Sequence, residues 1–215
     1  MACNYQGKIV TNGLVLCLDA ADKKSYPGTG TTWLDRSGNG NNGILTNGPT
    51  FSSDNGGSIV VDGVNDYISS VTLSTLSITD LTIQVWVYPT NISSYTTVFD
   101  TLGRNLSLWI GTTYYGLGGA STGGSPSFNW QNNTWVCITM LKSSNTGQII
   151  KNNYDFSDNV ATGSTFTNQL QFGSNPSGGG TPFVGRYGSI KLYNRALSQS
   201  EIQQNFNATR GRFGI

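Results

Sequence analysis

Histidine is absent from the 215-residue sequence, and glutamate occurs once, as Glu201. Without histidine the chain can form no histidine-based catalytic triad and no imidazole metal site. Most glycoside hydrolases need two carboxylates at a set separation, so a hydrolase of this kind would depend on aspartate pairs. Asp62 with Asp66, or Asp155 with Asp158, are examples of closely spaced pairs. We therefore expect a protein that is not an enzyme.

Charged residues are also scarce, at 11%, and 12 Lys and Arg nearly balance 11 Asp and Glu. A net charge of +1 provides no extended basic surface for nucleic acid or an anionic membrane. No apolar run approaches the ~20 residues of a membrane-spanning helix. The first residues lack the basic and apolar segments of a signal peptide. The sequence thus predicts synthesis in a cytoplasm, no nucleic-acid partner and no membrane insertion.

Cysteine is limited to Cys3, Cys17 and Cys137. An odd number without paired spacing argues against a disulfide framework, and the chain has no C-x-x-C zinc motif. Cys17 and Cys137 lie in apolar runs that read as strands. We expect both to be buried thiols.

What the chain does contain is glycine, 28 residues in all, separating short segments of alternating apolar and polar residues. This pattern is typical of antiparallel β-sandwiches. The expected strands cover residues 14–19, 58–62, 67–73, 81–89, 97–100, 106–112, 134–141, 147–154, 169–172 and 183–193. The sequence predicts an all-β fold with two antiparallel sheets.

One helix is expected, near the C-terminus. Ser198 and Glu201 have the spacing of a capping box, in which each side chain accepts a hydrogen bond from the other residue's backbone N–H. Leu197 and Ile202 are placed to pack across the start of this helix as a hydrophobic staple. Glycines at 211 and 214 make continuation past Arg210 improbable.

Four segments in order carry a family resemblance: residues 13–20 with 32–40, residues 61–68, residues 81–89 and residues 185–198. Together they resemble laminin-G-like modules of the concanavalin-A-like lectin/glucanase superfamily. The resemblance implies a jelly-roll domain over residues 13–208, preceded by an N-terminal arm (1–12) and followed by a C-terminal tail (209–215). Its end, residues 207–214, most resembles the versions of this domain in structural proteins of tailed bacteriophages.

Laminin-G-like modules often hold calcium through aspartates and backbone carbonyls, so the resemblance implies a calcium site. Calcium takes about six to eight oxygen ligands. Our candidate ligands are Asp35, Asn39, Asp62 and Asp66. The alternative is that these side chains stabilise turns without any ion.

A glycan site is predicted beside the glycine-rich segment 116–127. Sugars stack on exposed aromatic rings that are flanked by polar groups. The candidates are Trp109, Tyr114, Tyr115 and Trp130. Alternatively, these rings belong to the core or to a protein interface, where aromatic residues are common.

The C-terminal tail is a candidate docking segment. Arg210 and Arg212 offer bidentate hydrogen bonds, and Phe213 offers an apolar anchor. The alternative is a frayed terminus.

From these features we expect a non-enzymatic surface or structural protein of a phage virion. It would act as a capsid decoration or head- or tail-associated protein, and its partner would be the major capsid protein or another virion protein. The alternative is a lectin-like module, with or without calcium, that binds cell-surface glycans. No cofactor is required in either case.

Overall fold

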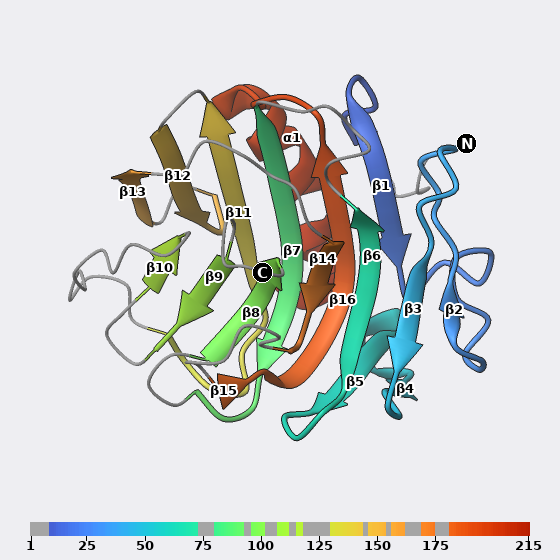
Figure 1. Cartoon of the computed structure of the whole chain (residues 1–215). Coiled ribbons are helices and arrows are strands. Elements are labelled where there is room, and N and C mark those ends of the chain that lie inside the picture. Colours follow the sequence, from blue (N-terminus) through green and yellow to red (C-terminus); the bar gives the residue numbers. More distant parts are fainter. Residues whose placement is uncertain are drawn as a thin grey trace.

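The structure is a computed structural model, and it describes residues 9–72, 80–92, 96–101, 107–111, 115–117, 130–143, 146–153, 156–161, 169–174 and 181–215. Two antiparallel sheets lie face to face, and one helix lies against the outer face of one of them (Figure 1). The predicted all-β, two-sheet sandwich with a short C-terminal helix is therefore confirmed, with the architecture of a concanavalin-A-like jelly roll.

The first sheet, sheet A, has the strand order β13-β12-β11-β7-β16-β5-β4, and β1 also pairs with β16. Its strands are β1 (Leu14–Asp19), β4 (Thr50–Ser52), β5 (Ser58–Asp62), β7 (Leu81–Pro89), β11 (Val136–Ser143), β12 (Thr146–Lys151), β13 (Phe156–Ala161) and β16 (Val184–Tyr193). A short 3-10 helix, η1 (Asp54–Gly56), joins β4 to β5.

The second sheet, sheet B, has the order β10-β9-β8-β14-β6-β3-β2, and β15 pairs with β8. Its strands are β2 (Thr32–Trp33), β3 (Gly43–Thr46), β6 (Tyr67–Thr72), β8 (Thr96–Thr101), β9 (Ser107–Ile110), β10 (Tyr115–Leu117), β14 (Gln169–Phe172) and β15 (Thr181–Pro182). Strand β3 is a difference from expectation, because residues 43–46 are not among the strands that the sequence predicts. Its Leu45 is buried and Ile44 is exposed, so the strand presents one apolar side chain to the core.

The core between the sheets follows from the period-two alternation of the strands. On β7, Ile83, Val85 and Val87 face the other sheet and join the main hydrophobic cluster. Gln84 and Trp86 alternate with them and face outward, yet both are fully buried. Something must therefore cover the outer face of sheet A.

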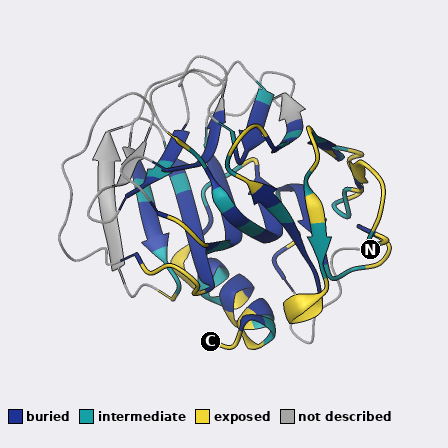
Figure 2. Cartoon of the chain, turned by 90° about the horizontal axis from the view of Figure 1, so that it is seen from below, coloured by how far each residue is buried: buried dark blue, intermediate teal, exposed yellow. Residues whose placement is uncertain are grey.

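That cover is the C-terminal helix α1 (Gln199–Thr209), followed by the 3-10 helix η3 (Arg210–Phe213). Figure 2 shows the helix against the strands, with its buried residues turned toward them. The capping box is confirmed: the Glu201 N–H donates to Ser198 Oγ, and the Ser198 N–H donates to Glu201 Oε2. Leu197 and Ile202 share one buried cluster, as the staple predicts.

The two cysteines in the described part of the core, Cys17 and Cys137, differ in oxidation state. Cys137 is free and buried, as expected, and burial raises the pKa of its thiol to about 12. The expectation of a free thiol is wrong for Cys17, which is disulfide-bonded. Within the described residues, no helix has the length and apolar character needed to cross a membrane.

Candidate functional site

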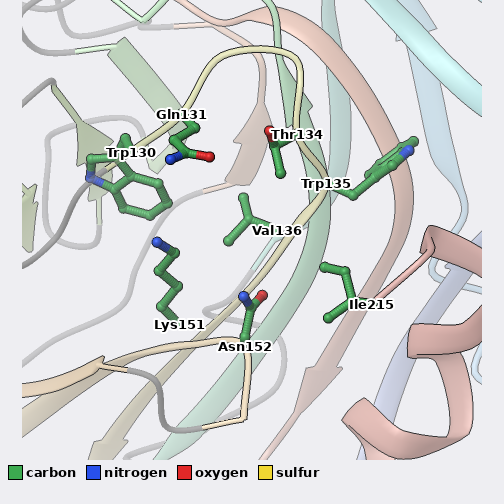
Figure 3. A pocket seen from close by; sticks show the side chains of 8 residues that line it. All are labelled: Trp130, Gln131, Thr134, Trp135, Val136, Lys151, Asn152 and Ile215. Carbon is green, nitrogen blue, oxygen red and sulfur yellow. The ribbon is translucent and has the colours of Figure 1, made fainter.

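A pocket of about 350 Å³ opens where β12 ends and β11 begins. Figure 3 shows Trp130 and Lys151 on one side of it, Trp135 and Ile215 on the other, and Val136 between them. Its described lining consists of Trp130, Gln131, Thr134, Trp135, Val136, Lys151, Asn152 and Ile215. Ligand pockets of proteins begin at about this volume and usually combine apolar walls with a few polar groups.

The two tryptophans form fixed walls of the pocket. Trp130 is 6% exposed and packs with the main core. Trp135 is equally buried, and its Nε1 donates to Asn55 Oδ1 at 3.0 Å. The Trp135 ring also packs against Phe213, with ring centroids 4.6 Å apart. Both indoles therefore present only small areas to the pocket, but in defined positions.

The end of β12 positions two polar groups at the pocket. Lys151 pairs with Ile138 of β11, and its Nζ lies 6.0 Å from the centroid of the Trp130 ring. Asn152 has a left-handed backbone with φ of 52°, which asparagine tolerates better than most residues. Its N–H donates to the Cys137 carbonyl at 2.8 Å, and its Oδ1 accepts from the Cys137 N–H at 3.1 Å. These two bonds fix the strand end that carries Lys151.

The turn before β11 supplies the remaining polar groups. Gln131 and Thr134 are exposed there. The turn itself is held against β7 and the segment after it, because the Asn133 N–H donates to the Pro89 carbonyl and Asn132 Oδ1 accepts from the Ile92 N–H. The pocket thus offers amide and hydroxyl groups on an anchored backbone.

No carboxylate side chain occurs among the described residues that line the pocket. Acid–base hydrolysis of a glycoside would need two there. Glu201 is committed elsewhere, since Arg195 contacts both of its oxygens at 2.6 and 2.8 Å. Those bonds, helped by the Ser198 N–H, lower the pKa of Glu201 to about 2. The pocket can bind a ligand, but its described side chains offer no acid–base pair.

The aromatic residues of the predicted glycan site do not all lie together. Trp130 lines the pocket, whereas Trp109 lies half-buried on the outer face of sheet B, opposite Thr97 of β8. Tyr115 belongs to β10, and its side chain lies outside the described residues. Tyr114 also lies outside them.

The Trp109 face of sheet B carries a row of polar side chains. Asp100 of β8 lies opposite Ser107 of β9 and Gln171 of β14. Ser107 Oγ donates to Asp100 Oδ1 at 2.5 Å, and Ser174 Oγ donates to Gln171 Oε1 at 2.9 Å. Asp100, Ser107 and Gln171 are buried, and Ser174 is partly exposed. The face is a second polar surface with an aromatic neighbour, separate from the pocket lining.

The first pair of predicted calcium ligands forms hydrogen bonds within its own loop and to β1. Asp35 accepts the N–H groups of Cys17, Ser37 and Asn41, and the Ser37 hydroxyl, at 2.6 to 3.0 Å. Asn39 Nδ2 donates to the Leu14 carbonyl at 3.1 Å. Asp35 thus ties the loop that follows β2 to β1.

The second pair, Asp62 and Asp66, closes the turn after β5. The Asp62 N–H donates to Asp66 Oδ2 at 3.2 Å, and the Val64 N–H donates to Asp62 Oδ1 at 2.8 Å. Burial raises the pKa of Asp66, while the Val64 bond lowers the pKa of Asp62. In the described part of the chain, no three acidic, cysteine or histidine side chains gather closely enough to hold a metal.

The C-terminal tail is built into the domain. Phe213 is 4% exposed and stacks on Trp86, with ring centroids 4.2 Å apart. Arg212 forms an ion pair with the buried Asp19 at 2.7 Å. Only Arg210 of the three predicted docking residues is exposed. Arg212 and Phe213 therefore hold the tail to its own sheet, which leaves little of the predicted docking segment to a partner.

The fold has many solved relatives. Domain 4 of AbnA, a GH43 extracellular arabinanase from Geobacillus stearothermophilus solved with arabinotriose, matches with a TM-score of 0.69 and 17% identity, over 89% of this chain and 97% of that one. Trypanosoma rangeli sialidase matches with a TM-score of 0.70 and 15% identity, over 93% of this chain but 33% of the sialidase. This chain thus spans about a third of the sialidase.

A third relative is the binding domain of Paraclostridial Mosquitocidal Protein 1, with a TM-score of 0.67 and 16% identity, over 92% of this chain and 52% of that one. No curated protein sequence matches the chain. Identities this low establish shared architecture alone. The sequence itself matches the family described as the concanavalin A-like lectin/glucanases superfamily over residues 62–203, well over half of its length. The chain therefore belongs to this superfamily.

Proposed function

We propose that this chain is a non-catalytic carbohydrate-binding domain that holds a sugar in the pocket between β11 and β12. The observation that carries the proposal is the lining, which joins indole and aliphatic walls to amide, hydroxyl and ammonium groups. A sugar ring has the same division, with apolar C–H groups on its faces and hydroxyls around its rim. The walls of such a pocket can fit the shape of the sugar ring, and its polar groups can fix the orientation of the ring through hydrogen bonds.

The pre-formed state of the pocket supports this function. Trp130, Trp135 and Asn152 are each held by packing or hydrogen bonds before any ligand arrives. Little side-chain entropy is then lost on binding. Domain 4 of AbnA, whose structure holds arabinotriose, agrees with a sugar ligand, although that domain is only 17% identical to this chain.

Catalysis is not part of the proposal. A retaining or inverting hydrolase places two carboxylates on either side of the bond that it cleaves. The described lining has no carboxylate side chain, and Glu201 serves the start of α1. The domain would hold a glycan without changing it.

The test is binding of a glycan array by the purified chain, followed by calorimetry on each hit. Gln131→Ala removes an exposed amide at the pocket. Trp130→Phe removes part of one wall, because its ring is smaller, but keeps an aromatic residue in the core. Trp109→Ala is the matched control on sheet B. We expect the two pocket variants to weaken binding several-fold and the control to leave it unchanged. Absence of any glycan ligand would overturn the function, and loss only in Trp109→Ala would move the site to sheet B.

We also propose that this domain is part of a phage virion, as the sequence predicts. Surface binding to a major capsid protein or another virion protein would use the exposed loops, because the tail is largely buried in its own domain. Mass spectrometry of purified particles tests this, and absence of the chain from them would contradict it.

Calcium dependence is likewise a proposal. Asp35, Asn39, Asp62 and Asp66 already have hydrogen-bond partners within the protein. Thermal unfolding with calcium and with a chelator decides the question, since an ion that binds the native state raises the unfolding midpoint.

A further inference from the structure

We infer that the outer face of sheet A binds internal water beneath α1, held by a polar cluster of Asp19, Gln84, Ser189 and Lys191. This site is separate from the pocket and does not depend on the proposed function. Each of the four side chains is at most 1% exposed, and each has one polar atom that no described residue hydrogen-bonds. These atoms are Asp19 Oδ2, Gln84 Oε1, Ser189 Oγ and Lys191 Nζ. Buried polar groups in native proteins are almost always paired with protein or ordered water, so the four atoms indicate a further partner.

The strand register places the four side chains next to one another. Ser189 of β16 lies opposite Asp19 of β1, and Lys191, two residues further along β16, lies opposite Gln84 of β7. Ile190, between Ser189 and Lys191, belongs to the main core, so its two neighbours lie on the outer face of the sheet. Opposite Cβ atoms in a ladder are about 4.5–5.5 Å apart. The four unpaired atoms therefore belong to one site rather than to scattered positions.

The C-terminal segment separates this cluster from bulk solvent. Arg212 of η3 binds Asp19 Oδ1 at 2.7 Å. Phe206 of α1 and Phe213 of η3 stack on the outward-facing Trp86, with ring centroids 5.6 and 4.2 Å from that of the indole. Figure 2 shows the helix against the strands with its buried residues turned toward them. Because this cover is fixed by stacking and an ion pair, water beneath it should exchange slowly with solvent.

The hydrogen bonds already made by two of these side chains show which atoms remain. Asp19 Oδ1 accepts from the Ala21 N–H and from Arg212, so only Oδ2 is left. Gln84 Nε2 donates to Thr139 Oγ1 at 3.0 Å, which leaves Oε1. Turning this amide over would leave Nε2 instead, so one end of Gln84 lacks a protein partner in either orientation.

The mixture of donors and acceptors identifies water as the ligand. Lys191 and Ser189 supply hydrogen atoms, whereas Asp19 and Gln84 supply unpaired oxygens. A cation would be repelled by the Lys191 amine and by Arg212, and an anion would be repelled by the two acceptor oxygens. Water both donates and accepts, and a buried water typically makes about three hydrogen bonds. It can therefore bridge groups of both kinds in this cluster.

A high-resolution crystal structure of the full chain tests the inference directly. We expect ordered water within hydrogen-bond distance of two or more of the four unpaired atoms. Crystals grown in bromide check the ligand class, because bromide gives an anomalous peak and water does not. An anion peak at the cluster would overturn the inference. Direct bonds among the four side chains, with no density between them, would overturn it as well.

Water ¹⁷O relaxation dispersion tests the same site in solution by counting long-lived internal water. The double variant Gln84→Met/Lys191→Met replaces two polar partners with apolar side chains and leaves Ser189 able to donate directly to Asp19. It should lower the count by about one water molecule or more. Lys24→Met, at an exposed position, is the control and should leave the count unchanged. An equal count in the double variant and the native chain would contradict the inference.

Discussion

Arg212 and Asp19 form an ion pair between segments that are 193 residues apart in the sequence, with 2.7 Å between Nη1 and Oδ1. Asp19 is fully buried, and the Arg212 side chain is 9% exposed. Arg212 Nε also donates to the Asn55 carbonyl at 2.7 Å, and its Nη2 donates to the carbonyls of Gly57 and Gly188. One side chain thus ties the end of the chain to β1, η1 and β16.

Replacing this arginine should destabilise the fold strongly. In Arg212→Met the buried Asp19 carboxylate loses its ion-pair partner, and removal of one member of a buried pair costs about 3–5 kcal/mol. Arg210→Met is the matched control, since Arg210 is exposed, and it should change stability by no more than about 0.5 kcal/mol. Chemical denaturation measures both. Equal stability of the two variants would show that the ion pair contributes little.

The Phe213 ring packs in a space that exists because residue 188 is glycine and has no side chain. A Cβ atom on Gly188 would lie 2.6 Å from Phe213 Cε1 and 3.2 Å from Trp135 Cζ3. Gly188→Ala should therefore cost about 1–3 kcal/mol, as overpacking usually does. At Gly211 an added Cβ meets no atom within 4 Å, so Gly211→Ala should be nearly neutral.

A double variant shows whether the clash is with Phe213. Phe213→Ala alone should cost about 3–5 kcal/mol, because a large buried ring is lost. In that background the ring no longer occupies the space, so Gly188→Ala should cost much less than it does in the native chain. Additive losses in the double variant would place the effect of Gly188→Ala in the backbone of β16 instead.

The tail marks the limit of what the sequence could predict. The capping box at Ser198 and Glu201 is local, and its spacing alone predicted where α1 begins. The role of Arg212 depends on Asp19 at the other end of the chain, and no local pattern links the two. The docking prediction came from residue types that suit an interface, and the same types suit an internal clamp.

The pocket likewise combines a residue that the sequence predicted with residues that it did not. Trp130 was predicted as a binding residue because it lies beside the glycine-rich segment 116–127 and its ring suits stacking on a sugar. Lys151 and Asn152 were missed, since they reach the pocket through the β11–β12 pairing rather than through proximity in sequence. One signal was available: Asn152-Asn153 follows a strand, and asparagine at a strand end often takes a left-handed turn.

Lys191 is a buried amine that should weaken the fold. It is fully buried on β16 opposite Gln84, and its Nζ makes no hydrogen bond with the described residues. Burial lowers its pKa, although the charge of Asp19 opposes this. The native state therefore releases a proton more readily than the unfolded chain, and this contribution makes stability increase as pH rises toward the ordinary lysine pKa of 10.5.

Lys191→Met should consequently stabilise the protein at pH 7, by about 1 kcal/mol or more, because well-packed apolar replacements of buried charges are often stabilising. The gain should shrink as the pH approaches 10. Lys24→Met, at an exposed site, should show neither effect. Destabilisation by Lys191→Met would mean that the amine supports the Asp19 carboxylate together with Arg212.

Glu201 gives the start of α1 a pH dependence of the same sign as that of Lys191, but in the acidic range. Its hydrogen bonds from Arg195, and then from the Ser198 N–H, lower its pKa from 4.5 to about 2. An acid with a depressed native pKa stabilises the fold above its ordinary pKa, and that stability is lost as the pH falls through the native pKa. The window for this group is therefore pH 5 down to about 2. Its side chain is 28% exposed, so solvent screening limits the effect to about 1–2 kcal/mol.

Two variants separate the charge of Glu201 from the cap itself. Glu201→Gln keeps an acceptor for the Ser198 N–H but loses the ion pair with Arg195, so it should cost about 1 kcal/mol at pH 7 and progressively less toward pH 2. Ser198→Ala keeps the ion pair but removes the hydroxyl that accepts the Glu201 N–H. It should cost a similar amount at every pH, because that hydroxyl does not titrate. Urea unfolding from pH 7 to pH 2 measures both profiles, and parallel profiles would show that the charge on Glu201 contributes nothing to the stability of α1.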